Sequence, residues 1–319
     1  MGGEQWQILS AMVIYMAVVI GIGIYYAKRA SANSKNFLIG GRKMGPWITA
    51  MAAEASDMSG WLLMGLPGVA YWYGLSDAVW TAIGLLIGTY LNWLLVAKRL
   101  RAYSFLAGDA ITIPEFFSNR FKEEKKVLML LSSLFILVFF TVYASSCFVT
   151  VGKLFSALFD VNYHLMMILG ALFVVFYTFI GGFLAESASD FMQGIVMFIS
   201  LVVVLIAGTA VAGGLSAVIA NARRIPGFLE FTGIAQPVMA NGVQQLGARG
   251  EPLFGPAGHY GLLTIISTLS WGLGYFGMPQ VLLKFMAIKK TQELGFSRRI
   301  ATSWCAISLV AAVGIGIIG

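Results

Sequence analysis

The sequence predicts an all-α integral membrane protein, and three observations point to this fold class. Hydrophobic residues make up 59% of the 319 residues and charged residues only 11%, whereas soluble domains are about 25% charged. The mean hydropathy is +0.83. Apolar runs of about 20 residues, the length that crosses a hydrocarbon core as a helix, recur along the chain, and the basic residues gather between them.

The apolar runs give eight candidate transmembrane helices. They begin near Gln7, Trp47, Ala78, Val127, His164, Phe191, Leu262 and Ile300. Glu4 precedes the first run and Lys28 follows it, the reverse of the charge order in a cleavable signal peptide. We therefore expect residues 7–27 to remain as an extra N-terminal helix whose N-terminus lies outside.

Three connections between the predicted helices concentrate positive charge. They run from Lys28 to Lys43, from Lys98 to Lys126 and from Lys284 to Arg299, and they hold 17 of the 21 Lys and Arg residues. If the first helix begins outside, all three connections fall inside, as the positive-inside rule requires. The net charge of +7 thus indicates topology and contact with anionic membrane lipids, and we expect a multi-pass protein of the cytoplasmic membrane that binds no nucleic acid.

The cysteines, histidines and glycine motifs of this sequence lack the spacing that metalloenzymes and nucleotide-binding proteins need. Cys147 and Cys305 fall inside apolar runs, where cysteine acts as a small buried hydrophobe. His164 and His259 are far apart and form no HExxH motif, and two GxGxxG matches follow no predicted strand. Catalytic acid, base and nucleophile sets are not apparent either. We expect neither an enzyme nor an organic cofactor.

Two connections have a composition of their own. Residues from Gly213 to Tyr260 contain four prolines and are too polar to span, so we expect an outer loop. The inner connection from Ala107 to Lys126 mixes Pro114 with aromatic and charged residues, which predicts a short interfacial helix with a structural role.

The second apolar run contains the stretch EASDMSGWLLMGLPG. Glu54 and Asp57 lie three residues apart in it and are followed by small residues and by Pro67. An acid at the membrane midplane costs roughly 2.5–3.5 kcal/mol on insertion scales, so such residues usually pair with something or mark a pathway. A helix that unwinds here would free carbonyl oxygens, which a bound cation would satisfy. Packing of the acids against neighbouring helices is the alternative.

The seventh run contains STLSWGLGYFGMPQ, which places glycines and a proline inside a predicted span. Trp271, Tyr275 and Pro279 recur every four residues, so in an α-helix they would form one aromatic stripe suited to a small ring or aliphatic body; a packed core stripe is the alternative. Interrupted helices in matching positions of two halves indicate a transporter's midplane site. Spans two and seven are five apart, which predicts a five-plus-five inverted-repeat transporter fold preceded by one extra helix.

Longer motifs carry a resemblance to a known family. LIGGRKMGPWITAMAAEASDMSGWLLMGLPG, SWGLGYFGMPQVLLKFMA, LFILVFFTVYASS and YTFIGGFLAESASD resemble the sodium/solute symporter family, especially its proline-transporting branch. Glu54 departs from the pattern, which has glycine there. The resemblance implies sodium-coupled symport of L-proline by alternating access, with Na⁺ as the coupling ion.

The resemblance also implies an organisation. Residues 1–319 form a single transmembrane symporter domain, with the first inverted repeat and the outer loop in residues 44–257 and the start of the second repeat in residues 258–319. The family's fold has further helices after this point. We therefore expect an incomplete version of the symporter that inserts in the membrane but does not transport by itself.

Site residues follow from the resemblance position by position. The sodium ion is expected to contact the carbonyls of Ala55 and Met58, with the carboxylate of Asp57 needed for tight coupling. The solute is expected to contact Ser59, Gly60, Tyr143, Trp271, Tyr275 and Pro279. Arg42 and Asp190 are expected to influence sodium use, Asp190 as a possible further ligand.

Several alternatives remain open at this point. Asp190 stands three residues after Ser187, the spacing of a capping box at the start of the sixth span. Arg42 could be a topology-setting cation, and Tyr143 could serve packing. Carriers of pantothenate or sugars, and a symporter-like membrane sensor, are the competing functions; the set of Trp271, Tyr275 and Pro279 favours proline.

Overall fold

The computed structural model describes residues 3–247 and 250–319, and its regular structure is mostly helical, as the sequence predicted. In the described part of the chain, five helical stretches are long and apolar enough to span a membrane. They are Gln5–Ala30, Leu75–Leu106, Val127–Phe159, Tyr163–Val211 and Thr291–Ile318. The full count of eight crossings stays a prediction.

Helix α9 (Tyr163–Val211) accounts for two of the predicted runs. Its 49 residues would measure about 74 Å if straight, more than twice a hydrocarbon core of about 30 Å. The helix breaks at Gly182, where φ is 59° and ψ is −160°, a conformation that is essentially restricted to glycine. Because the helix resumes directly after Gly182, Ser187 and Asp190 lie inside it. The capping-box alternative for Asp190 is therefore wrong.

Two helical segments are interrupted where the sequence predicted it. The first consists of α3 (Pro46–Gly60), a π-helical turn η2 (Trp61–Gly65) and α4 (Leu66–Tyr73), and the break falls at Ser59 with φ 47° and ψ −160°. The second consists of α11 (Leu262–Leu269), a 3₁₀ segment η4 (Ser270–Gly277) and α12 (Pro279–Ala287). The repeat relationship between the two segments remains a prediction.

The chain forms two compact units that interleave along the sequence. Unit 1 comprises the residues up to Asp57, Leu94–Gly194 and Pro279–Arg298, and unit 2 comprises Met58–Trp93, Ile195–Met278 and Arg299–Gly319. Both interrupted helices pass from one unit to the other at their interruption.

Unit 1 is helical. Besides the parts of α3 and α9 that belong to it, it contains α1 (Gly3–Ala30), α2 (Ser34–Ile39), η1 (Gly40–Arg42), α6 (Lys98–Leu106), α7 (Ile113–Arg120), α8 (Val127–Phe159), α12 and η5 (Thr291–Glu293). Helix α1 packs closely on α9, since a Cβ atom on Gly181 would lie 2.9 Å from the Cα atom of Gly23. The expected helix in the inner connection is α7, and Thr112 caps it by accepting a hydrogen bond from the amide of Glu115.

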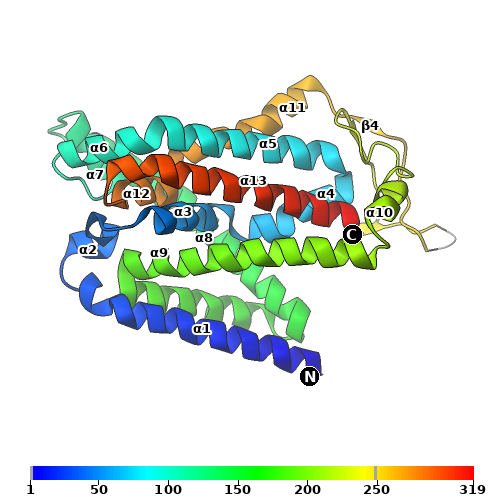
Figure 1. The fold of residues 1–319 in the computed structure, drawn as a ribbon, viewed down its shortest axis with the longest axis horizontal. Helices are drawn as coiled ribbons and strands as arrows, with labels where there is room; N and C mark the ends of the chain where they lie inside the picture. Colours follow the sequence, from blue (N-terminus) through cyan, green and yellow to red (C-terminus); the bar gives the residue numbers. More distant parts are fainter. Residues whose placement is uncertain (1–2, 248–249) are drawn as a thin grey trace. The chain divides into compact units, whose positions relative to one another are not determined.

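Unit 2 contains α5 (Leu75–Leu91) and the larger part of α13 (Leu294–Ile318). These two helices run side by side in Figure 1, and the Sγ atom of Cys305 lies 3.9 Å from the Oγ1 atom of Thr89. The expected outer loop contains α10 (Leu215–Ala222) and two short antiparallel pairs. These are β1 (Gly233–Ile234) with β4 (Gly258–His259), and β2 (Met239–Ala240) with β3 (Val243–Gln244). The hydroxyl of Tyr260 donates a hydrogen bond to Asp77 at 2.5 Å and so ties the end of this loop to α5.

Helix α5 and segment η4 touch backbone to backbone within unit 2. A Cβ atom on Gly88 would lie 2.3 Å from the carbonyl oxygen of Gly272, and a Cβ atom on Gly84 would lie 2.5 Å from that of Leu269, the last residue of α11. Gly272 of the SWGLGYFG motif therefore serves close packing.

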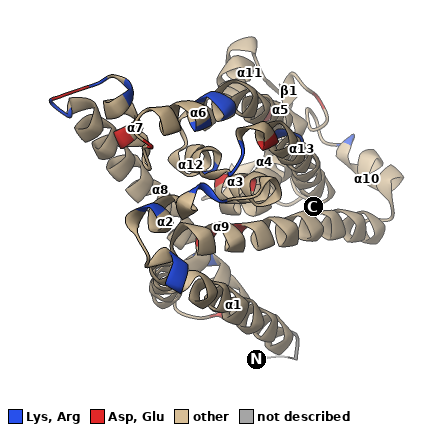
Figure 2. Cartoon of the chain, turned by 60° about the vertical axis from the view of Figure 1, so that its left-hand side comes forward, with Lys and Arg blue, Asp and Glu red and all other residues tan. Residues whose placement is uncertain are grey.

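Charged residues are sparse along the helices and gather at the ends and connections of unit 1, around α2, α6 and α7 (Figure 2). Lys284 is an exception. The sequence placed it at the start of an inner connection, but it lies inside α12 with 0% of its surface exposed. Its role cannot be that of a solvated topology signal.

Candidate functional site

The break in α3 is the first element of the site. Ser59 is a non-glycine residue in a conformation that glycine alone adopts readily, and such strain, of order 1–3 kcal/mol, concentrates at functional sites. Glu54 and Asp57 precede the break, and Glu54 is only 3% exposed. The Oδ1 atom of Asp57 is buried and accepts no hydrogen bond from the described residues. A buried carboxylate oxygen without a donor beside unwound backbone is suited to a hard cation.

Tyr143 of α8 reaches this turn. Its hydroxyl lies 3.4 Å from the carbonyl oxygen of Ser56, to which it donates a hydrogen bond. Ser56 lies between Ala55 and Asp57, so unit 1 brings together three residues that the resemblance placed in the site. The expected contact of Tyr143 with the solute stays a prediction, and packing stays the alternative.

Helix α9 supports the same turn from another side. A Cβ atom on Gly194 would lie 3.5 Å from the Cβ atom of Ala55 and 3.2 Å from the Cε atom of Met51. Helix α9 thus lies against α3 at Gly194, beside Ala55, whose carbonyl is a proposed ligand.

Unit 2 gathers a second group of expected residues. The hydroxyl of Tyr275 lies 3.7 Å from the sulfur of Met58, to which it donates. Trp61 and Trp271 lie with ring centroids 5.4 Å apart and planes inclined by 34°. Met58, Trp271 and Tyr275 were expected from the sequence, whereas Trp61 was not, although it directly follows the glycine of the SGW triplet.

Asn92 is another residue that the sequence analysis missed. It is 1% exposed, and its side-chain amide donates a 2.8 Å hydrogen bond to the carbonyl oxygen of Tyr275. Asn92 directly follows α5, so this bond holds the backbone of η4 next to the C-terminal end of that helix. A single asparagine inside an apolar run could have indicated such a contact, because a buried side-chain amide needs a hydrogen-bond partner.

The predicted aromatic stripe is wrong in its geometry. Segment η4 winds as a 3₁₀ helix with three residues per turn, so residues four apart point about 120° away from each other. Trp271 is accordingly 53% exposed, while Tyr275 is 7% exposed. Pro279 begins α12 and belongs to unit 1.

Lys284 forms a buried ion cluster with α9. Its Nζ atom lies 2.5 Å from Oε2 of Glu186, 2.9 Å from Oγ of Ser187 and 3.1 Å from Oδ2 of Asp190. The ammonium also lies 4.7 Å from the centre of the Phe183 ring, a cation–π contact. The carboxylate of Asp190 is therefore already paired with a positive charge.

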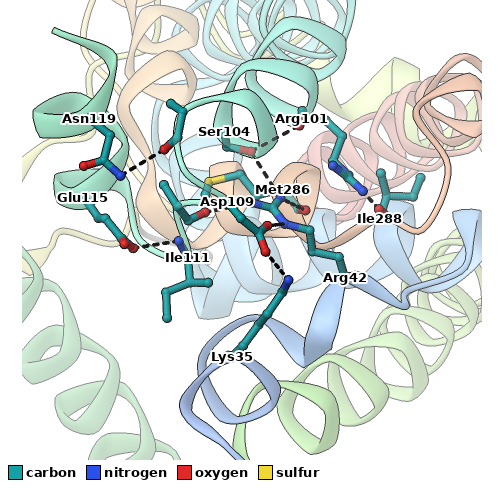
Figure 3. A network of polar contacts seen from close by, with 12 residues as sticks. Lys35, Arg42, Arg101, Ser104, Asp109, Ile111, Glu115, Asn119, Met286 and Ile288 are labelled. Atoms are coloured by element: carbon teal, nitrogen blue, oxygen red, sulfur yellow. Dashed lines mark hydrogen bonds and ion pairs between the residues drawn. The ribbon is translucent and has the colours of Figure 1, made fainter. Parts of the chain in front are cut away.

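Arg42 is the centre of a polar network at one end of unit 1 (Figure 3). It is 6% exposed. Its guanidinium donates to Asp109 at 2.8 Å, to Ser104 at 3.1 Å and to the carbonyl oxygens of Met286 and Ala110 at 2.6 and 2.8 Å. Arg42 thus joins η1, α6 and α12 through these acceptors, and its expected influence on sodium use stays a prediction.

Lys35 completes the network through an ion pair with Asp109. Partial burial by itself would raise the pKa of Asp109, but hydrogen bonds from Lys35 and Arg42 outweigh burial and hold this pKa below its ordinary value. Asp109 is thus an ionised anchor that connects the two basic residues. Arg101 adds a further link by donating to the carbonyl oxygen of Ile288 at 2.8 Å.

Comparison with known proteins decides the family. The model of the sodium:solute symporter family matches residues 37–319. The chain belongs to this family. Sodium/proline symporters of Staphylococcus aureus, among them those of strains USA300 and COL, are 43% identical over 317 residues, which cover 99% of this chain and 56% of theirs. This member of the family therefore spans little more than half the length of those relatives.

A solved structure agrees at the level of the fold. The substrate-bound, outward-open state of a Na⁺-coupled sialic acid symporter aligns with a TM-score of 0.75 at 18% identity, covering 99% of this chain and 61% of that one. Together with the family match and the apolar helices, this establishes a multi-pass membrane protein of a transporter family.

Proposed function

We propose that the complete gene product to which this chain belongs carries out sodium-coupled symport of L-proline across the cytoplasmic membrane by alternating access. The observation that carries the proposal is the break of α3 at Ser59, next to a buried Asp57 oxygen without a hydrogen-bond donor. The relatives that are 43% identical are named for the same ion and solute.

Sodium is assigned to the turn that precedes the break. Na⁺ is a hard cation that prefers oxygen ligands, and the end of an interrupted helix presents its carbonyl dipoles with the negative end outward. The carbonyls of Ala55 and Met58 and the carboxylate of Asp57 supply such oxygens. The contact of Tyr143 with the Ser56 carbonyl supports this assignment, because it places a hydroxyl at the same turn.

Proline is assigned to the residues around the two breaks: Ser59, Gly60, Tyr143, Trp271, Tyr275 and Pro279. The contact between the Tyr275 hydroxyl and Met58 supports this assignment, since it joins an expected solute residue to an expected sodium residue. The inclined rings of Trp61 and Trp271 offer an apolar surface of the kind that a small saturated ring would contact.

The sodium assignment is tested by replacing Asp57 in the complete gene product. Asp57→Ala should abolish sodium-dependent uptake in proteoliposomes, and Asp57→Glu should retain part of it with weaker sodium affinity. Ser56→Ala is the matched control, because the Ser56 hydroxyl donates within α3, to the carbonyl of Ala52 at 2.7 Å. Normal sodium activation of the Asp57→Ala protein would remove the site.

The solute assignment is tested by competition. Labelled proline should be displaced by close ring analogues and barely by glucose or pantothenate, and Tyr275→Ala should weaken the binding of proline more than that of sodium. Effective displacement by pantothenate or by a sugar would assign the protein to another branch of the family. A protein that binds solute without moving it would instead support a sensor.

A further inference from the structure

Unit 2 contains an apolar cavity of about 430 Å³ between four of its helices. Its walls include Ile83 of α5, Leu205 of α9, Ile219 of α10 and Val310 of α13, and every described residue that lines it belongs to unit 2. The volume lies within the range of about 300–1,000 Å³ that is typical of sites for small molecules. The cavity is separate from both helix interruptions, since no residue of α3, η2 or η4 is among the described residues that line it.

The lining of the cavity favours hydrocarbon. Among the described residues that line it, Thr209 is the one with a polar side chain, and its hydroxyl already donates a 2.7 Å hydrogen bond to the carbonyl oxygen of Leu205. The other lining residues are aliphatic or glycine. A polar solute would lose its hydrogen bonds to water in this cavity and gain none in return, so the occupant needs a long apolar part.

The cavity has the length of one membrane leaflet. Its lining residues on α13 run from Ala306 to Ile318, over which the helix rises about 18 Å. Half of a hydrocarbon core of about 30 Å is about 15 Å. Val310 is 71% exposed and Leu215 is 65% exposed, so the cavity is open on one side. Helix α13 is long and apolar enough to span the membrane, and the open side therefore faces lipid.

Two arginines follow the wall that α10 contributes. Leu215 and Ile219 line the cavity one helical turn apart, and Arg223 lies one turn further on the same face. The helical pattern continues to this position, because the amide of Arg223 donates a 3.0 Å hydrogen bond to the carbonyl oxygen of Ile219. Arg223 and Arg224 are exposed, and neither guanidinium forms an ion pair with a described residue. Two uncompensated positive charges thus follow directly on an apolar wall.

We propose that this cavity binds one acyl chain of an anionic phospholipid whose phosphate is held by Arg223 and Arg224. A guanidinium binds phosphate oxygens through paired N–H donors, and a phospholipid joins such an anion to a hydrocarbon chain. Because α10 lies in the predicted outer loop, the lipid comes from the outer leaflet. The proposal is independent of the identity of the transported solute.

A later segment of the complete gene product is the competing occupant, since the relatives of this chain are longer. Charge favours the lipid. An apolar segment that filled the cavity would leave Arg223 and Arg224 without a counter-ion, whereas an anionic phospholipid supplies both the hydrocarbon and the negative charge.

The test measures lipid binding to the complete gene product by native mass spectrometry, after removal of the lipid that purifies with it. Phosphatidylglycerol and phosphatidylcholine with identical acyl chains are the two probes. One phosphatidylglycerol should bind saturably and about 25-fold more tightly than phosphatidylcholine, because each arginine contributes about fivefold in affinity for anionic lipid. Arg223→Gln/Arg224→Gln should abolish this preference. Lys125→Gln/Lys126→Gln, which removes two exposed charges from unit 1, is the matched control and should retain it.

The apolar part of the site is tested by filling the cavity. Ala82→Phe on α5 and Ala306→Phe on α13 each add a ring at a lining position and should weaken the binding of both lipids alike. Ala220→Phe, at an exposed position of α10 that is not among the lining residues, is the control. Two filling variants on different helices keep the test informative if one of them does not fold.

Three outcomes would overturn the proposal. The first is a preference for phosphatidylglycerol that survives the loss of both arginines, and the second is unchanged lipid binding by the folded filling variants. The third is a wild type that binds no lipid saturably, which would favour a later segment of the gene product as the occupant. None of these outcomes depends on sodium or proline, so they leave the proposed function to its own tests.

Discussion

Gly272 of η4 lies against the backbone of α5, and its replacement by alanine tests how closely these two elements are packed. A Cβ atom at position 272 would lie 2.1 Å from the carbonyl oxygen of Gly84 and 3.1 Å from the Cα atom of Gly88. Both are backbone atoms, which no side-chain rotation moves away. Restoring an ordinary contact requires the two elements to separate by roughly 1 Å.

The expected cost of Gly272→Ala follows from that geometry. Overpacking of a tight interior contact destabilises a protein by about 1–3 kcal/mol, which for a chain of this size lowers the melting temperature by about 1.5–4.5 °C. The same displacement moves Tyr275, which we propose as a solute ligand, so on that proposal the affinity for the solute should fall as well. The hydrogen bond from Asn92 to the Tyr275 carbonyl should lengthen or break, because it bridges the two elements.

Gly274→Ala is the matched control. Gly274 lies in the same 3₁₀ segment, but a Cβ atom there would meet nothing within 4 Å. The two variants add the same methyl group and the same backbone preference, so their difference isolates the contact with α5. Intrinsic tryptophan fluorescence of the purified protein would follow unfolding. Equal melting temperatures for the two variants would refute the close-packing argument.

Three further predictions concern strain and charge. Ser59→Gly should raise the free energy of unfolding by about 1–3 kcal/mol because it relieves the strained backbone; Ser59→Ala keeps the strain, and an equal gain from it would contradict this reason. Arg42→Gln should lower the free energy of unfolding by about 3–5 kcal/mol, whereas Lys35→Gln, at a side chain that is 41% exposed, should cost under about 1 kcal/mol; equal thermal shifts would be evidence against a buried network. The pKa of Asp109 is lowered in the folded protein. Ionised Asp109 should therefore stabilise the folded protein fully at pH values above the ordinary Asp pKa of about 3.9, and this stabilisation should be lost as the pH falls through the pKa of Asp109 in the folded protein. The difference in melting temperature between wild type and Asp109→Asn should therefore shrink below about pH 4.

The interrupted helices were predictable from the sequence because they have local causes. Glycine, serine and proline inside an apolar run oppose a continuous helix wherever they occur, and the break at Ser59 lies within such a stretch. The position of the break in α9, by contrast, could not be predicted from the sequence. The two glycines at 181 and 182 stand between apolar residues on both sides, and nothing in the hydropathy marks which residue adopts the unusual conformation.

The ion clusters were not predictable, since they depend on contacts between distant segments. Lys284 and Glu186 are separated by 98 positions in the sequence, and a lysine near the end of an apolar run is ordinarily a topology signal. The prediction of an aromatic stripe in η4 was wrong for a different reason. The four-residue spacing assumes an α-helix, and close contact with α5 through Gly88 and Gly272 accompanies a tighter winding instead.

Helix α12 shows how the polar groups of unit 1 act together. Lys284 ties its middle to α9, and Arg42 and Arg101 hold the carbonyl oxygens of Met286 and Ile288 at its C-terminal end. These ties use the carbonyls that a helix end leaves without partners, so the end of α12 is fixed by charged donors. Its other end begins at Pro279, where the helix interruption and the boundary of unit 1 coincide.

In α3, too, the helix interruption coincides with a unit boundary, which falls between Asp57 and Met58, next to the strained Ser59. A helix that has lost part of its hydrogen-bond ladder bends at that point with less loss of free energy than a continuous one. The residues that break each helix are also those assigned to sodium and proline. In each of the two helices the interruption is therefore the point at which bending costs the least free energy.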